Sequence, residues 1–434
     1  MYQIPDNFHI KLETRDGFPL SDSLSDPNPG KEVHMKGERY VYACALAGVL
    51  AIGAALWHPF NEAKADRAPT LDPPNFRVDP FWPKPLPDNW VTGEIGGTCV
   101  DSRDHLFIFT RGFQTGGLVS PEGVGGQPDQ SKASPPVIEF DRQGNVVNSW
   151  GDPSLEPATN PDGSANPNAG KNAVLPNGTH GCFIDSEDNV WLAGNGDGVV
   201  QKWSHDGSRL LLQIGTKFVC DAPGGVCANV GATGNSPTLL NLPADIAVDP
   251  DTGDVYIADG YGNHRIVVFD RQGKFLRQWG GVGSGPGEFF AGDGGHPHCV
   301  VMSRQGLIYT CDRGNDRIQV FDKFGNVQRI IPVIPGTNAL GTAGSAWDVD
   351  FSPDRAQKFM YDSDGGNEVM WIFDHAAGKI LAGFGRPGHM AGEFTFLHMM
   401  SVDSKGNLYV GETVGGRRVQ KFVKRDSGRD DDHH

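Results

Sequence analysis

Short runs of alternating apolar and polar residues, separated by turns rich in glycine and proline, recur along most of the chain. Two stretches show this most clearly: "ADIAVDPDTGDVYIADGYGNHRIVVFDRQGKFLRQWG" (244–280) and "HCVVMSRQGLIYTCDRGNDRIQVFDKFGNVQRII" (298–331). Each reads as four strands joined by turns and a polar loop, because a period of two is typical of a β-strand buried on one face. The period of an α-helix is nearly absent, so the chain is predicted to be all-β.

Weaker copies begin at residues 97–112, 180–195, 347–363 and 398–412, which makes six units. The sequence therefore predicts a six-bladed β-propeller over residues 76–424, in which each four-stranded sheet stands radially and its innermost strand lines a central channel. The last unit lacks a strand, whereas "NFRVDPFWPKP" (75–85) has no unit of its own. We expect this N-terminal segment to supply the missing outer strand and to close the ring.

An uncharged apolar run, "YVYACALAGVLAIGAALW" (40–57), precedes the repeats. Its length suits the core of a signal peptide better than a membrane span, and A-K-A (63–65) is a cleavage pattern. We predict a polar stretch that lies before the true start (1–34), a signal peptide or membrane anchor (35–65), a linker (66–75) and, after the propeller, a disordered tail (425–434). The protein is expected to be exported, either periplasmic or secreted, and an uncleaved segment 40–57 would anchor it to the membrane.

Composition and charge narrow the class of partner. The chain has 434 residues, of which 38% are hydrophobic, which is enough to build a core. Its formal net charge is -16. Nucleic acids and anionic membrane surfaces both require a basic face on the protein, so we expect no nucleic-acid partner and no membrane contact except through the N-terminal segment.

Export makes the seven cysteines candidates for disulfide bonds. Cys220 and Cys227 bracket the turn-rich stretch "DAPGGV" and are the first predicted pair. Cys299 and Cys311 lie on neighbouring strands of one hairpin and are the second. Cys44 falls in the apolar run, and the sequence assigns no partner to Cys99 or Cys182.

Histidine recurs at one position of the repeat. The six units can be aligned on the acidic or serine residue that ends the first strand: Asp101, Asp185, Asp249, Ser303, Ser352 and Asp403. Five positions upstream stand Gly96, His180, Ala244, His298, Trp347 and His398. We refer to these six positions as the hub column. Histidine therefore occupies the hub column in the second, fourth and sixth units only.

Alternate blades of a six-bladed ring are related by about 120°, so residues at the head of alternate inner strands converge on the axis. Three imidazoles would then make three corners of a tetrahedral site with its fourth position open, the arrangement of a catalytic zinc ion. Imidazole suits zinc and other late divalent metals. His296 competes with His298 as the ligand from its blade, and the shared column favours His298. The prediction is a metal site, most simply zinc, held by His180, His298 and His398.

The chain resembles the NHL-repeat propellers, and among them the peptidyl-α-hydroxyglycine α-amidating lyases. The resemblance covers most of residues 76–424 and is carried by "FTRG" (109–112), "LPNGTHGCFID" (175–185), "ADGYGNHRIVVF" (258–269), "HPHCVVMSRQGLIYTCDRGNDRIQVF" (296–321) and "FLHMMSVDSKGNLYVGE" (396–412). It implies a zinc site on the same three histidines and Tyr261 as the catalytic base. It also implies that Arg111 orients the substrate carboxylate and stabilises charge, with Arg313 nearby.

Two departures from that family concern its other bound ion and its substrate. The family pattern has an aspartate directly after the third metal histidine, where it helps to hold a structural Ca²⁺, but Met399 stands there in this chain. Gly262 replaces a disulfide cysteine of the family. A structural Ca²⁺ is therefore a weaker expectation than Zn²⁺, and the substrate is a small molecule or a peptide with an α-hydroxyglycine-like end.

The expected reaction is cleavage of the C–N bond of a carbinolamide, N-CH(OH)-COO⁻, to an amide and glyoxylate. A metal lowers the pKa of a hydroxyl group that it binds, and Tyr261 would accept the proton. Arg111 can hold a carboxylate through two parallel hydrogen bonds, and its charge, together with the metal, would favour an ionised Tyr261. Two alternatives remain: an exported NHL-repeat scaffold that binds protein or glycan partners, and another metal-dependent propeller enzyme such as a lactonase-like hydrolase.

Overall fold

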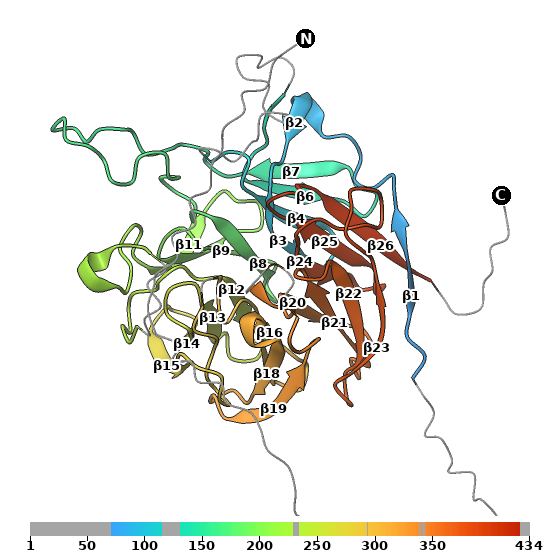
Figure 1. Cartoon of the computed structure of the whole chain (residues 1–434). Helices are drawn as coiled ribbons and strands as arrows, with labels where there is room; N and C mark the ends of the chain where they lie inside the picture. The colour runs from blue at the N-terminus through green and yellow to red at the C-terminus, as the bar shows by residue number, and fades with distance from the viewer. Residues whose placement is uncertain are drawn as a thin grey trace, which may run out of the picture. The chain divides into compact units, whose positions relative to one another are not determined.

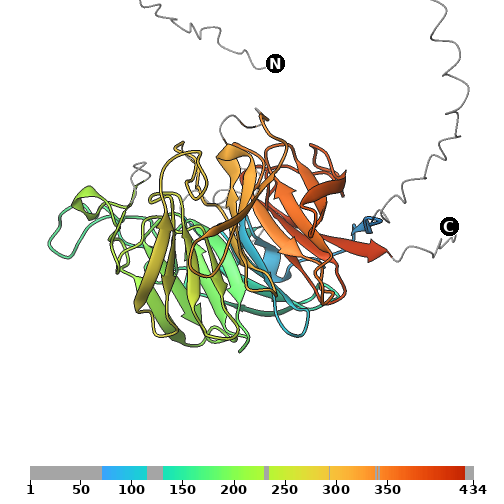
Figure 2. The same cartoon turned by 90° about the horizontal axis from the view of Figure 1, so that it is seen from below.

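The structure is a computed structural model, which describes residues 71–114, 131–228, 234–292, 294–337, 340 and 343–425. Within these residues, six four-stranded antiparallel sheets are arranged in a ring, with the first strand of each unit nearest the centre (Figure 1). Viewed at 90° to that direction, the sheets stand face to face (Figure 2). The predicted all-β, six-bladed propeller is therefore confirmed.

The blades follow one another along the chain. Blade 1 is β3 (Ile95–Val100), β4 (Leu106–Thr110), β6 (Val137–Phe140) and β7 (Val146–Trp150), and blade 2 is β8 (Thr179–Ile184), β9 (Val190–Gly194), β10 (Val199–Trp203) and β11 (Leu210–Gly215). Blade 3 is β12 (Asp245–Val248), β13 (Val255–Asp259), β14 (Arg265–Phe269) and β15 (Phe275–Gly280), and blade 4 is β16 (Val300–Met302), β17 (Ile308–Asp312), β18 (Arg317–Phe321) and β19 (Val327–Pro332). Blade 5 is β20 (Asp348–Phe351), β21 (Phe359–Asp364), β22 (Val369–Asp374) and β23 (Lys379–Phe384). Blade 6 is β24 (Leu397–Val402), β25 (Leu408–Glu412), β26 (Val419–Arg425) and β1 (Asn75–Asp79), and a small parallel pair, β2 (Trp90–Val91) with β5 (Lys132–Ala133), lies outside the ring of sheets.

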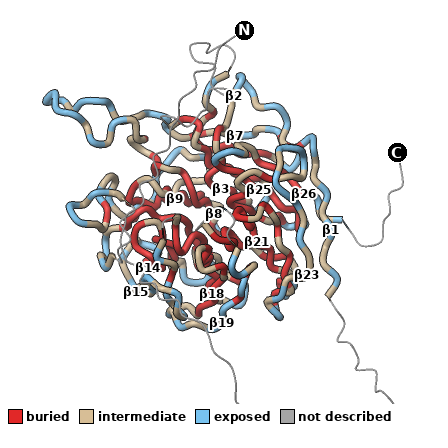
Figure 3. The backbone as a smooth tube through the Cα atoms, in the orientation of Figure 1, coloured by how far each residue is buried: buried red, intermediate tan, exposed pale blue. Residues whose placement is uncertain are grey.

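Burial explains why the strands differ in composition. The second strands β4, β9, β13 and β17 are buried at every residue, because a neighbouring blade covers each of their faces. The outer strands β15 and β19 are only partly covered, and nearly all of their residues are half-buried or exposed. Figure 3 shows this gradient from the buried centre to the exposed rim. Continuous apolar runs in the sequence therefore mark middle strands, and alternating runs mark the rim.

The N-terminal strand closes the ring, as predicted. β1 pairs with β26 in antiparallel register from Asn75 opposite Arg425 to Asp79 opposite Lys421. Phe76 packs against the rings of Tyr361 and Phe384 of blade 5, with centroids 5.6 and 5.3 Å apart. The last blade is thus completed by residues from the opposite end of the chain, which leaves no unpaired edge between the first and last blades.

A repeated arginine ties each incoming loop to its blade. Arg265 forms an ion pair with Asp259 at 3.0 Å and donates hydrogen bonds to three backbone oxygens of the preceding loop. Arg317 and Arg418 do the same from β18 and just before β26, with Asp312 and Glu412 as their acids at 2.7 Å. These three arginines serve the architecture of the repeat.

Three disulfide bonds join six of the cysteines. Both predicted pairs, Cys220–Cys227 and Cys299–Cys311, are present. The third, Cys99–Cys182, links β3 of blade 1 to β8 of blade 2 across 83 residues of sequence. Such bonds are typical of proteins that work in an oxidising compartment.

No helix long and apolar enough to cross a membrane occurs among the described residues. The predictions for residues 1–65 fall outside them and stay predictions.

Ring closure can be tested at Phe76. Phe76→Ala removes a half-buried ring between blades 5 and 6 and should lower the free energy of unfolding by about 2 kcal/mol. Arg77→Ala is the matched control, because Arg77 is an exposed residue of the same strand, and it should change stability by less than about 0.5 kcal/mol. Urea denaturation of the three proteins measures the difference. Equal effects of the two substitutions would contradict closure by this strand.

Candidate metal centre

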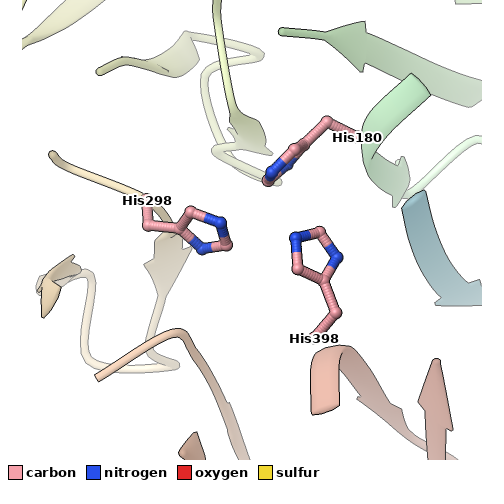
Figure 4. Close-up of side chains that lie close together, drawn as sticks. All are labelled: His180, His298 and His398. Carbon is pink, nitrogen blue, oxygen red and sulfur yellow. The ribbon is translucent and has the colours of Figure 1, made fainter. Parts of the chain in front are cut away.

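Three histidines from alternate blades meet at the inner ends of the sheets. His180 lies in β8, His398 lies in β24, and His298 lies two residues before β16. Their ring centroids are 4.6, 4.5 and 5.1 Å apart, and one nitrogen of each lies within 4.8 Å of the others. Figure 4 shows the three rings pointing toward one another. We call these residues the hub histidines. The competitor His296 packs against Phe290 instead.

The other ring nitrogen of each hub histidine is held by the next blade. The distances from Nδ1 to a backbone oxygen are 2.8 Å for His180 and Ala244, 2.7 Å for His298 and Trp347, and 2.8 Å for His398 and Gly96. These three acceptors are the hub-column residues of the following blades. Because a carbonyl oxygen can only accept, each Nδ1 carries the hydrogen and each Nε2 keeps its lone pair. The backbone thereby sets both the tautomer and the direction of every ring.

Burial keeps the hub histidines uncharged. His180 and His298 are fully buried, and His398 is 2% exposed. Burial, together with neighbouring positive charges such as Arg313, lowers the pKa of all three imidazoles well below 6.5. Nε2 of His298 has no hydrogen-bond partner among the described residues. Three neutral imidazoles with converging lone pairs, one of them unpartnered, fit a divalent metal ion such as Zn²⁺.

Tyr261 stands at the edge of the trio. Its hydroxyl lies 3.0 Å from Nε2 of His180 and donates to it, and its ring centroid is 5.3 Å from that of His180 and 6.0 Å from that of His298. The tyrosine follows β13 in the loop that faces the hub. At Gly295, a Cβ would lie only 2.6 Å from the Tyr261 ring and φ is +80°, so a glycine there allows this close packing.

Arg313 is a buried guanidinium with no acidic partner in the described part of the chain. It is 5% exposed and stacks on Trp347, with its guanidinium carbon 4.4 Å from the ring centroid and 5.9 Å from that of Tyr261. Its Nε is buried and donates to no acceptor among the described residues. Burial lowers the pKa of this guanidinium. A buried charge without a counter-ion is costly, so this site suits an anionic ligand.

Arg111 is engaged by protein groups. Its Nε donates to the Thr179 oxygen at 2.9 Å, and its Nη1 donates to Glu94 at 2.8 Å and to Thr413 at 3.2 Å. Burial tends to raise the pKa of Glu94, but the charge and hydrogen bonds of Arg111 outweigh it and lower the pKa. Arg313 also lies near Tyr261, with its guanidinium carbon 5.9 Å from the ring centroid, and the role of Arg111 beside Tyr261 stays a prediction. Sequence reasoning missed Glu94, which lies outside the repeated motifs.

A cavity of about 160 Å³ lies along the inner strands. Asp245, Asp348 and Asp350 line it, together with Met399. Burial raises the pKa of Asp245 and Asp350 to about 7, and burial and Asp245 raise that of Asp348 well above its usual range. Met399 therefore adjoins acids that blades 3 and 5 supply. The prediction of a structural Ca²⁺ stays a prediction.

Comparison with known proteins agrees with the repeat and the fold. The NHL repeat matches residues 240–269 and 295–321. Mouse NHL repeat-containing protein 3 is 26% identical over 375 residues, which cover 81% of this chain and 85% of that protein. Peptidyl-α-hydroxyglycine α-amidating lyase 1 of Drosophila melanogaster is 26% identical over 377 residues, which cover 79% and 59%. Peptidyl-glycine α-amidating monooxygenase B of Xenopus laevis is 26% identical over 360 residues, which cover 77% and 34%.

Fold and repeats together define a six-bladed propeller that carries NHL repeats. Within that class, the chain is similar to proteins named as amidating lyases and amidating monooxygenases. It spans about a third of the Xenopus monooxygenase.

The pH dependence of zinc binding tests the burial of the hub histidines. Since their pKa values are lowered, they remain neutral at pH 6, and Zn²⁺ affinity should fall by no more than about tenfold between pH 8 and pH 6. Protonation of three imidazoles with an ordinary pKa of 6.5 would by itself weaken binding roughly 60-fold. Competition with a coloured chelator measures the affinity. His298→Ala should abolish the binding at the hub histidines, whereas His389→Ala, which changes an exposed residue, should not.

Proposed function

We propose that this protein is a metal-dependent lyase that cleaves a carbinolamide, N-CH(OH)-COO⁻, into an amide and glyoxylate. The observation that carries the proposal is the convergence of three neutral imidazoles beside Tyr261 and the buried Arg313, which has no acidic partner among the described residues. Similarity to proteins named as peptidyl-α-hydroxyglycine α-amidating lyases supports it. The substrate is a small molecule or a peptide that ends in an α-hydroxyglycine-like group.

The hub histidines would hold the metal, and we propose Zn²⁺. When bound, the ion supplies Lewis acidity, which lowers the pKa of a hydroxyl group placed at its open position. The backbone bonds to Nδ1 keep the three Nε2 lone pairs aimed at one point, so little reorganisation accompanies binding. Tyr261 lies 3.0 Å from one of these nitrogens, which places its oxygen beside any group bound there.

Tyr261 accepts the proton of the substrate hydroxyl. The electron pair of that O–H bond forms the carbonyl of glyoxylate as the C–N bond breaks, and the departing nitrogen takes a proton to become the amide. Tyr261 can return the proton that it accepted, so the step balances without another reactant. The guanidinium of Arg313, stacked alongside, would stabilise the negative charge that the tyrosine oxygen must carry before it accepts the proton.

Arg313 and Arg111 divide the recognition of the substrate carboxylate unequally. Arg313 has a guanidinium to which no described residue is hydrogen-bonded, so it can present two parallel N–H groups. Arg111 already uses Nε and Nη1 on protein oxygens. We therefore propose that Arg313 binds the carboxylate and that Arg111 orients it through its charge and its remaining nitrogen.

The three disulfides support export, and we propose a periplasmic or secreted enzyme.

Turnover tests the reaction. Zinc-loaded protein incubated with α-hydroxyhippurate should release glyoxylate, and Tyr261→Phe should lower kcat at least about 100-fold because the proton acceptor is lost. Tyr361→Phe is the matched control, since the hydroxyl it removes is buried and has no partner among the described residues. Absence of glyoxylate from the zinc-loaded protein would reject the lyase and leave the scaffold interpretation.

The division between the two arginines predicts a difference in kinetic constants. Arg313→Ala should raise KM for α-hydroxyhippurate by about 100-fold, the loss of roughly 3 kcal/mol from a charge-assisted pair, while Arg111→Ala should raise it less. Arg386→Ala, which removes an exposed arginine, is the control. A larger KM effect at Arg111 than at Arg313 would overturn the assignment.

A further inference from the structure

A second cluster of metal-ligating side chains lies where blade 1 meets blade 2. Asp101 follows β3, His105 precedes β4, and Glu139 lies in β6; each offers one ligand atom, and the three atoms lie within 4.8 Å of one another. His205, from the turn between β10 and β11, places Nε2 3.1 Å from Oδ2 of Asp101. The side chains of Asp101 and Glu139 are buried, at 0% and 5% exposed, while the two imidazoles reach solvent.

The guanidinium of Arg103 now occupies the centre of this cluster. Its Nη2 lies 2.7 Å from Oδ2 of Asp101, 2.9 Å from Oε1 of Glu139 and 2.8 Å from Nε2 of His205. Nη2 has only two hydrogens for these three acceptors, and an arginine nitrogen cannot accept. Nε2 of His205 contacts both Nη2 of Arg103 and Oδ2 of Asp101, and either tautomer satisfies only one of the two contacts: a lone pair on Nε2 faces the acceptor Oδ2, and a hydrogen on Nε2 faces the donor Nη2. A single cation that can engage every lone pair would satisfy the cluster better than Nη2.

The equivalent places in two other blades show what the repeat uses when no such ion is needed. Asp185 of blade 2 and Asp403 of blade 6 correspond to Asp101 in the repeat. The residue six positions after each of these aspartates pairs across the sheet with a lysine, Lys202 in blade 2 and Lys421 in blade 6. Lys202 forms an ion pair with Asp185 at 2.9 Å. Blade 1 has Glu139 at this place, so an acid replaces a base beside an already acidic residue.

A second residue of blade 1, His105, also differs from its counterparts in blades 2 and 6 and also favours a metal site. Four positions after the aspartate, blades 2 and 6 have Asn189 and Asn407, and each donates a side-chain hydrogen bond to that aspartate. Blade 1 has His105 there, with Nδ1 2.7 Å from Oε1 of Glu139. Both departures of blade 1 thus place a side chain of a kind that can ligate metal where blades 2 and 6 have a lysine or an asparagine.

We propose that Asp101, His105, Glu139 and His205 bind a divalent transition-metal ion of the zinc class, with Arg103 displaced. Two imidazoles and two carboxylates are a ligand set that zinc accepts. Oδ1 of Asp101 is fixed by the backbone N–H groups of Arg103 and His105 at 2.9 and 2.8 Å, which leaves Oδ2 turned to the cluster. The Arg103 side chain is 53% exposed and can withdraw into water. His105 binds through Nδ1 after its proton moves to Nε2.

The ion would join the two blades whose inner strands carry the Cys99–Cys182 disulfide. Its role is structural, because the ligands come from turns and a strand away from the hub histidines. The proposal is independent of the lyase reaction and does not require it.

Zinc content tests the site. Equilibrium dialysis of the whole protein against Zn²⁺ should give two ions per chain in the wild type and one in the double variant His105→Asn, Glu139→Lys, which has in blade 1 the residues of blades 2 and 6 and should keep its fold by circular dichroism. His298→Ala should lose the other ion. His389→Ala, an exposed residue outside both clusters, should keep both. An unchanged zinc content in the double variant would overturn the proposal.

The displaced arginine gives a second measurement. Arg103→Ala removes the cation that competes with the metal, so the variant should bind the ion of this cluster at least about tenfold more tightly than the wild type. Measured in the His298→Ala background, the affinity reports on this cluster alone. Equal or weaker binding by the Arg103 variant would show that the arginine does not occupy the metal position and would overturn that part of the assignment.

Discussion

The hydrogen bond from each hub imidazole to a backbone oxygen of the next blade is the interaction on which the site depends. The bonds of His180, His298 and His398 each cross a blade boundary, so the three rings are aligned only while the six sheets hold their places. Ring closure by β1 therefore fixes side chains far from it in the molecule. A metal at the hub would stabilise the closed ring, because it would bind only the folded arrangement.

Further contacts join blade 1 to blade 2, blade 3 to blade 4 and blade 5 to blade 6. Asp245 of blade 3 accepts a hydrogen bond from the backbone N–H of Val300 in blade 4, and Asp348 of blade 5 accepts one from Met400 in blade 6. Blade 1 has Gly97 at the corresponding position, where a Cβ would lie 2.9 Å from the backbone nitrogen of Cys182. The Cys99–Cys182 disulfide takes over that junction. Three pairs of blades are thus joined internally by carboxylates or a disulfide, and to one another by the hub histidines.

Burial has opposite effects on the acids and bases of the inner strands, and both effects remove charge. It lowers the pKa of the hub histidines and raises the pKa of Asp245 and Asp350 to about 7. Arg313 remains cationic even though burial lowers its pKa, because the pKa of an arginine ordinarily lies far above neutral pH. Among the described residues near the hub, Arg313 is a buried positive charge that no aspartate or glutamate neutralises. Such a charge favours binding of an anion, and the carboxylate of the proposed substrate is one.

The repeated pattern by itself determined the six blades, the closing strand, the converging histidines and the two disulfides between cysteines close in sequence, because these features depend only on position within the repeat or on a local turn. The tertiary structure alone decided the Cys99–Cys182 bond, the pairing of Arg111 with Glu94, the placement of Arg313 over Tyr261 and the cluster around Arg103. Each of these joins residues of different blades or of a loop outside the repeat. Their distances are set by how the sheets pack around the ring, which alternation of apolar and polar residues along the chain does not encode.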